Sequence, residues 1–273
     1  MQRFVRFEAL VANSSITYNV SLPPPESPRG VLVVIHGYSR TTTLAAAFAK
    51  PAARDGLLLL APIFDADIYG SFQTLRGSSG PRAAADALNA AHEDATRLFG
   101  IASAPSSLVG ISGGAQFAHR YAMCFPARVA ALVAASAGWY TMPDPHVGFP
   151  YGLAPSDDLP EGIGMLDEFV RIPIRVMVGD KDTRRDVLLR RSRAIDRVQG
   201  RNRLERAHRW VQAVSAYASS RGENSSIALE VLPGCGHSSR EAVRKGQMVQ
   251  RTMSFLVGCQ TWQPTAASAE PWD

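Results

Sequence analysis

Cysteine is scarce in this sequence, and its few cysteines are spaced too widely to act together. The chain has 273 residues and three cysteines, Cys124, Cys235 and Cys259. An odd number with no CxxC pair excludes a disulfide framework and a zinc site built on paired cysteines. We expect no metal site in this chain.

Long apolar runs are also missing. No run approaches the roughly 18 residues that a membrane helix needs, so we expect no membrane partner. Residues 1–4 do not lead into the long apolar region of a signal peptide. The sequence as it stands therefore predicts a cytoplasmic protein, and a secreted one if it is a truncated piece of a longer chain.

Lysine is rare as well, and arginine carries most of the positive charge. The formal net charge is +5, but segment 184–209 holds ten arginines against Asp186, Asp196 and Glu205. Such a basic stretch can bind nucleic acid or anionic lipid. No nucleic-acid motif accompanies it, so we expect no nucleic-acid partner and interpret the segment as a solvated helical face. The alternative is that it docks the protein onto an anionic surface or polymer.

The order of the apolar segments predicts an α/β fold in one domain over residues 1–258. Runs typical of buried strands alternate with helical spacing, which predicts a mostly parallel twisted sheet of about eight strands with helices on both faces. Strands are expected at 4–11, 16–22, 31–35, 57–61, 107–111, 129–135, 174–178 and 227–232, the first two forming a hairpin, and helices at 44–54, 82–99, 115–124, 204–217 and 240–256. The irregular insertions 138–171 and 183–202 are candidate lid elements, and the tail 259–273 is expected to be disordered.

A glycine-rich turn supplies the candidate nucleophile. Gly110, Ser112 and Gly114 form a Gly-x-Ser-x-Gly pattern between a predicted strand and a predicted helix. A reactive serine must protrude from a sharp turn, and small neighbours leave room for that turn. We therefore predict that Ser112 is a nucleophile, against the alternative of an idle serine in a glycine-rich turn.

A base and an acid follow later strands. His237 lies directly after the last predicted strand, where it can take the proton of the serine and return it to a leaving group. The acid that orients this imidazole is ambiguous, because Asp180 and Asp182 follow the same strand. We favour Asp182, which lies a few residues beyond the strand end, with Asp180 as its main rival and Asp144 as a third option.

Two backbone N–H groups are expected to bind a developing oxyanion. One belongs to Gly113, next to the nucleophile at the positive end of the following helix, and the other to Tyr38. The Tyr38 ring could also contact an acyl group. Trp139 and Tyr140 follow a predicted strand directly, so they are candidate substrate contacts, with core packing as an equal alternative.

These segments resemble the α/β-hydrolase superfamily, whose members carry an oxyanion loop, Ser, Asp and His in this chain order. Within it, the chain is similar to polyhydroxybutyrate depolymerase-like and feruloyl-esterase-like serine esterases. The residues that carry the resemblance are 36–38, 61–65, 112–120, 137–143 and 232–237. The resemblance implies a serine esterase that needs no cofactor and acts through an acyl-enzyme.

The sequence therefore predicts a carboxylic ester hydrolase with the triad Ser112, His237 and Asp182. Its expected substrate is a small-molecule or oligomeric ester, such as a hydroxyalkanoate oligomer, another polyester or an aryl ester. Two alternatives are a non-catalytic binding protein on a hydrolase fold and an acyltransferase that uses the same triad. The complete set of three residues argues against the binding protein. The sequence predicts no particular oligomeric state.

Overall fold

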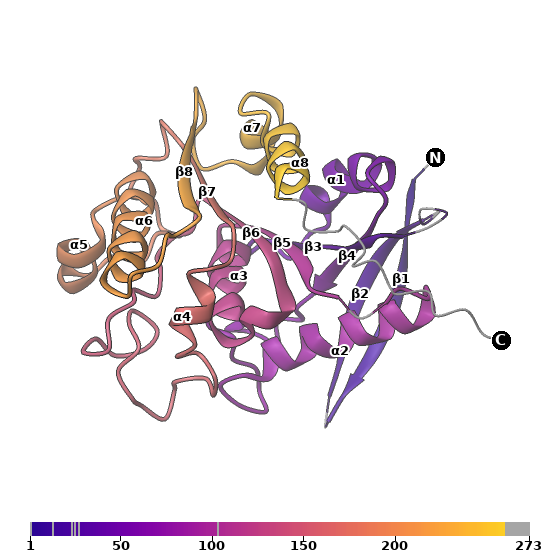
Figure 1. The fold of residues 1–273 in the computed structure, drawn as a ribbon, viewed down its shortest axis with the longest axis horizontal. Helices are drawn as coiled ribbons and strands as arrows, with labels where there is room; N and C mark the ends of the chain where they lie inside the picture. The colour runs from indigo at the N-terminus through magenta and orange to yellow at the C-terminus, as the bar shows by residue number, and fades with distance from the viewer. Residues whose placement is uncertain are drawn as a thin grey trace.

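The computed structural model describes residues 2–12, 14–22, 24, 26, 28–102 and 104–259. They form one sheet of eight strands in the order β1-β2-β4-β3-β5-β6-β7-β8 (Figure 1). The strands are β1 (Arg3–Val11), β2 (Ser14–Leu22), β3 (Gly30–Ile35), β4 (Leu57–Ile63), β5 (Ser106–Ile111), β6 (Val129–Ala135), β7 (Ile174–Gly179) and β8 (Ile227–Leu232). The predicted fold class is confirmed.

Strand direction changes at one side of the sheet. β1 and β2 form the predicted antiparallel hairpin, and β2 is antiparallel to β4. The strands from β4 through β3 to β8 are all mutually parallel. Because parallel neighbours end at the same edge, the segments that follow β3, β5, β7 and β8 emerge together there.

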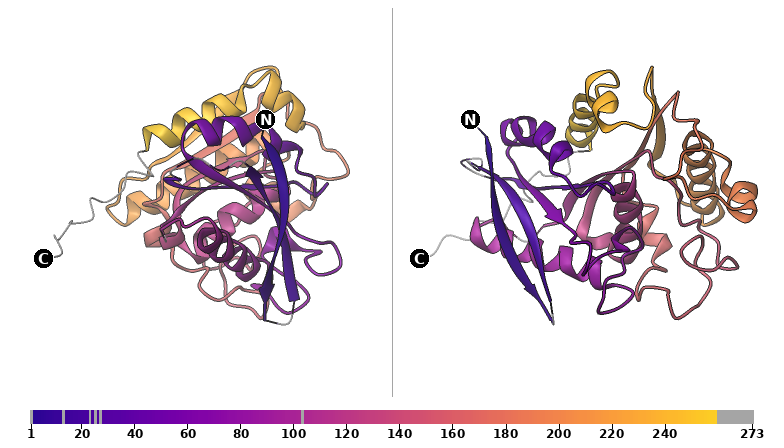
Figure 2. Two further views of the ribbon diagram at one scale, coloured as in Figure 1. Left: turned by 90° about the vertical axis from the view of Figure 1, so that its right-hand side faces the viewer. Right: turned by 180° about the vertical axis from the view of Figure 1, so that it is seen from behind.

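Helices cover both faces of the sheet, as Figures 1 and 2 show. Leu44 and Phe48 of α1 join Met253 of α8 in the core of one face. On the other face, α2, α3 and α6 bury side chains that include Leu88 and Trp210. The helices are α1 (Thr43–Arg54), α2 (Ala83–Leu98), α3 (Gly113–Cys124), α4 (Leu166–Phe169), α5 (Arg193–Gln199), α6 (Arg203–Ser220), α7 (Ser239–Arg244) and α8 (Met248–Gly258), with short 3₁₀ turns η1 (Phe72–Thr74) and η2 (Pro126–Arg128).

The prediction of one continuous helix over 240–256 is wrong, because the chain breaks between α7 and α8. Gln247 takes a left-handed conformation with φ 50°. Before it, Gly246 packs so closely that an added Cβ would lie 2.9 Å from the Ala242 carbonyl oxygen and 3.0 Å from Cys235 Sγ. The apolar periodicity continues across the break, but the left-handed backbone of Gln247 and the poor helix propensity of Gly246 end the helix there.

The two insertions contain short helices that periodicity did not predict. α4 lies in 138–171 and α5 in 183–202, and each is too short to show a clear helical repeat. The disorder predicted for 259–273 falls outside the described residues, except at Cys259. In the part of the chain that the structure describes, no helix is both long and apolar enough to cross a membrane.

The interpretation of 184–209 as a solvated face is wrong for two of its arginines. Arg203 and Arg206 in the first turns of α6 are 1% and 0% exposed. Arg206 donates to the carbonyl oxygens of Gly138 and Gly200 and to Asp196. These arginines therefore stabilise the loops around α6 from the inside, where charged groups are found only with hydrogen-bonding partners.

Candidate active site

Ser112 lies on a strained turn between β5 and α3. Its backbone has φ 54° and ψ −114°, a conformation that costs a non-glycine residue about 1–3 kcal/mol. Two glycines make the turn possible. An added Cβ on Gly110 would lie 2.3 Å from the Gly114 carbonyl oxygen, and one on Gly114 would lie 2.3 Å from the Ile35 carbonyl oxygen. The Ser112 side chain consequently lines a cavity at the edge of the sheet.

Three side chains from the ends of β5, β7 and β8 form a hydrogen-bonded chain. Ser112 Oγ lies 3.1 Å from His237 Nε2, and His237 Nδ1 lies 3.0 Å from Asp182 Oδ2. Asp182 is only 1% exposed. With Nδ1–H donating to the carboxylate, Nε2 of the neutral imidazole is free to accept the Ser112 hydroxyl proton.

The rival acids are engaged elsewhere. Asp180 Oδ1 accepts the backbone N–H of Cys235 at 3.2 Å, which braces the turn after β7 against the turn after β8. Asp144 Oδ1 accepts the N–H of His146 within its own loop. Of the three aspartates considered, Asp182 alone has a carboxylate bonded to His237 in the described residues.

His36 holds the loop that follows β3. Its ring is buried, and Nδ1–H donates to the Gly37 carbonyl oxygen at 2.7 Å. The other ring nitrogen, Nε2, accepts the Phe64 N–H at 3.0 Å. Burial lowers the pKa of His36 to about 4, so the ring is neutral at physiological pH and acts as a fixed brace.

The braced loop brings the Tyr38 backbone to the start of α3. An added Cβ on Gly113 would lie 3.5 Å from the Tyr38 nitrogen, so the two backbones are close neighbours. Gly113 N–H is one of the first amides of α3 and has no partner within the helix. Tyr38 N–H likewise makes no hydrogen bond among the described residues. The Tyr38 ring is 62% exposed and lies beside the Arg40 guanidinium.

A cavity of about 270 Å³ opens beside Ser112 and His237. Its wall combines hydroxyl groups with a few apolar side chains: His36, Gly37, Tyr38, Ser39, Thr41, Thr43, Leu44, Ile111, Ser112, Leu188, His237, Ser238 and Ser239. Leu188 belongs to insertion 183–202, whereas insertion 138–171 contributes none of these residues. No cluster of three or more potential metal-ligating side chains is found within the described ranges.

Trp139 and Tyr140 are not in the wall of this cavity. Tyr140 is fully buried, and its ring stacks on Trp210 with centroids 4.6 Å apart. Trp139 is 7% exposed and packs against the Arg120 guanidinium, 4.2 Å from the ring centroid. Their contact with substrate stays a prediction, while their positions match the alternative of core packing.

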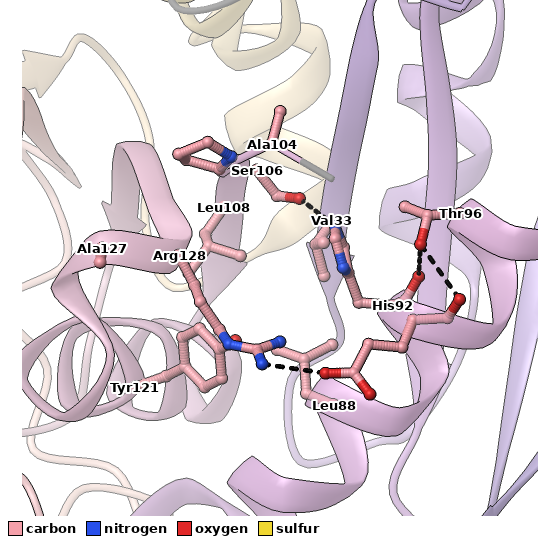
Figure 3. Close-up of a pocket in the computed structure, with 12 residues that line it drawn as sticks. Val33, Leu88, His92, Thr96, Ala104, Ser106, Leu108, Tyr121, Ala127 and Arg128 are labelled. Carbon is pink, nitrogen blue, oxygen red and sulfur yellow. Dashed lines mark hydrogen bonds and ion pairs between the residues drawn. The ribbon is translucent and has the colours of Figure 1, made fainter. Parts of the chain in front are cut away.

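A second serine–histidine pair lies at the opposite end of β5 (Figure 3). Ser106 Oγ is 2.7 Å from His92 Nε2, in a cavity of about 280 Å³. No carboxylate hydrogen-bonds to His92 among the described residues, and Ser106 has ordinary strand geometry. The pair lacks both the acid and the exposed turn of the Ser112 site, so it offers a matched control serine.

Comparison with solved structures finds hydrolases of the same architecture. A poly(aspartic acid) hydrolase-1 from Sphingomonas sp. KT-1 has a TM-score of 0.79 and 23% identity, covering 93% of this chain and 98% of that one. A poly(3-hydroxybutyrate) depolymerase from Bordetella parapertussis has a TM-score of 0.75 and 26% identity, covering 97% and 92%. An S-formylglutathione hydrolase from Agrobacterium tumefaciens has a TM-score of 0.63 and 15% identity, covering 96% of each chain. No protein-family model and no curated protein matches the sequence.

Proposed function

From the premise that this chain has the α/β-hydrolase fold, we propose that it is a carboxylic ester hydrolase with Ser112 as nucleophile. His237 is the general base and then the general acid, and Asp182 orients its ring. The observation that carries the proposal is the hydrogen-bonded chain from Ser112 Oγ through both nitrogens of His237 to the buried Asp182.

The reaction has two halves that use the same groups. Ser112 Oγ attacks the ester carbonyl while His237 takes its proton, and the N–H groups of Tyr38 and Gly113 hold the resulting oxyanion. Collapse of this intermediate breaks the bond to the alcohol, which leaves with the proton from His237. Water then attacks the acyl-enzyme by the same route and releases the acid.

The cavity favours a short polar acyl group. Its volume is about 270 Å³, below the range usual for drug-sized ligands, and its wall includes the hydroxyls of Ser39, Thr41 and Thr43. Hydroxyalkanoate oligomers fit this description, because each unit carries a short chain and polar oxygens. The activity named for the poly(3-hydroxybutyrate) depolymerase among the structural neighbours supports this class of substrate.

Hydrolysis of p-nitrophenyl esters from acetate to laurate tests the proposal. We expect the wild-type protein to favour the short acyl chains and Ser112→Ala to lose at least about 10³-fold in kcat/KM. Ser106→Ala removes a serine from the other serine–histidine pair and should keep wild-type turnover. Failure of the wild-type protein on every ester, with no labelling by a fluorophosphonate, would instead support a non-catalytic binding protein.

A further inference from the structure

A buried arginine lies behind the candidate triad. Arg203 is the first residue of α6, and its guanidinium contacts two carboxylates. Nη1 lies 3.4 Å from Asp182 Oδ1 and 2.8 Å from Asp186 Oδ2, while Nη2 lies 3.1 Å from Asp186 Oδ1. Arg203 and Asp182 are each 1% exposed, so the contact between them is weakly screened, whereas the Asp186 side chain is 34% exposed and its contact is partly screened by solvent.

The two carboxylates connect this arginine to different parts of the site. Asp182 uses Oδ2 for His237, so its two oxygens are divided between the imidazole and the guanidinium. Asp186 Oδ1 accepts the backbone N–H groups of Leu188 and Leu189, each at 2.9 Å. Since Leu188 lines the cavity beside Ser112, Asp186 fixes a part of the wall of that cavity.

We propose that Arg203 is a positioning residue that holds the triad acid and the cavity loop in one ionic network. This inference rests on the proposed function, because it gives Arg203 a role only if Asp182 and His237 work together on Ser112. Arg203 touches neither the serine nor the cavity, so it acts through the two aspartates. Its guanidinium suits the task, because its planar array of N–H donors can serve two carboxylates at once.

The arrangement sets the net charge around His237 as well as the geometry of the site. One arginine offsets two carboxylates near His237, and its hydrogen bonds lower the pKa of Asp186 below the usual range. A variant that lacks the Arg203 charge leaves His237 facing two uncompensated carboxylates, which favours the protonated imidazole. As the pH is lowered, this variant should therefore lose activity at a higher pH than the wild-type protein does. Removing the Asp186 charge has the opposite effect.

Other titratable groups lie around this network and are unchanged in both variants. They are the Tyr140 hydroxyl near Asp182, Glu241 of α7 and Lys245 just after it, Cys235 after β8, and Asp180 and Lys181 in the turn after β7. They contribute a constant background, so the difference between the two variants reports on Arg203 and Asp186.

The test is the pH dependence of kcat/KM for p-nitrophenyl butyrate, repeated as the pH dependence of the fluorophosphonate labelling rate. For Arg203→Gln we expect a lower rate. We also expect the acidic limb of the profile, where kcat/KM falls as the pH is lowered, to move to higher pH by about 0.5–1 unit. For Asp186→Asn we expect a shift in the other direction. Arg203→Lys should restore the position of the limb, because it keeps the charge, but not the full rate, because it loses the planar donor array.

Arg206→Gln is the matched control. Arg206 is equally buried in the same helix, and it contacts carbonyl oxygens and Asp196 rather than the triad. This variant should lose stability without moving the acidic limb. If Arg203→Gln does not fold, Arg203→Lys still decides the question, because a full wild-type rate in that variant would contradict the need for the planar donor array.

Two results separate failure of the inference from failure of the proposed function. The first result is wild-type activity that depends on Ser112, with acidic limbs that do not move in either Arg203→Gln or Asp186→Asn. It would overturn the role of Arg203 and leave the proposed function standing. A wild-type protein that neither turns over esters nor reacts with a fluorophosphonate would overturn the proposed function itself.

Discussion

At the scale of single residues, the site depends on which of two neighbouring aspartates faces the imidazole. Asp182 is buried against His237, whereas Asp180 is exposed and accepts an N–H from the turn after β8. The carboxylate of a triad fixes the imidazole tautomer and stabilises the charged ring that forms during the reaction. Asp182 and Asp180 are only two residues apart, but only the loss of the Asp182 carboxylate should disturb the imidazole.

We predict that Asp182→Asn lowers kcat/KM for a short p-nitrophenyl ester by about 10³–10⁴-fold, because the amide favours the wrong tautomer. Asp180→Asn, the matched control, keeps an acceptor for the Cys235 N–H and should change the same constant less than about threefold. Steady-state kinetics of the two variants check this, and equal losses would count against Asp182 as the acid.

A second prediction concerns the turn that presents Ser112. Gly114→Ala should destabilise the protein by more than about 2 kcal/mol, because its Cβ would overlap the backbone oxygens of Ile35 and His36. Gly258→Ala places the same methyl group at the end of α8, where nothing lies within 4 Å, and should be neutral or slightly stabilising. Urea unfolding of both variants measures the difference, and equal stabilities would contradict this account of the turn.

Sequence reasoning identified the residues of the hydrogen-bonded chain but not the arginine behind it. Ser112 and His237 each follow a recognisable apolar strand, so pattern and order were enough to select them. Asp182 was favoured over Asp180 on the same pattern, but only the fold shows which of the two is bonded to His237. Arg203 carries no such signal, because an arginine within a basic segment resembles any solvated charge. Only the fold places it under Asp182, together with the Asp186 partner that makes its burial tolerable.

At the scale of elements, prediction was accurate where a mostly apolar run of strand length defines a strand, whether it is largely buried like β6 or partly exposed like β8. The bounds predicted for 129–135 and 227–232 coincide with those of β6 and β8. It was wrong where local backbone geometry overrides periodicity, as at the break between α7 and α8. It also missed α5, whose role lies in tertiary contacts of the buried Gln199 rather than in a repeat.

Gln199 joins α5 to the segment after β6. Its side chain accepts the Tyr140 N–H at 2.9 Å and donates to the Tyr140 carbonyl oxygen at 2.8 Å. We predict that Gln199→Ala costs about 2–4 kcal/mol, because it leaves two buried backbone groups without partners. Val198→Ala, on an exposed neighbour, should cost less than about 0.5 kcal/mol. Thermal and urea unfolding check the contrast, and a near-zero cost for Gln199→Ala would refute it.

At the scale of the whole molecule, buried histidines make stability depend on pH. Burial lowers the pKa of His36 to about 4 and lowers the pKa of His92 and His119 as well. In the unfolded chain the same groups bind protons near their ordinary value of 6.5, so between those limits the unfolded state holds more protons. Stability should therefore be fully present above about pH 6.5 and fall as the pH drops toward about 4.

We predict a loss of up to about 1.4 kcal/mol per pH unit from His36 in this window. The unfolding free energy, measured from about pH 8 to about pH 4, checks the slope. His36→Asn removes this ionisation and should flatten the slope, even if the variant is less stable throughout. An unchanged slope in the variant would mean that His36 is not the group that titrates.

The most direct test of the central claim is to trap the nucleophile and identify it. The intact protein is incubated with a fluorophosphonate, and the modified peptide is mapped by mass spectrometry. We predict one adduct per chain on Ser112, unchanged in Ser106→Ala, absent from Ser112→Ala and strongly slowed in His237→Ala. An adduct on another serine, or none under conditions that label known serine hydrolases, would contradict the assignment of Ser112.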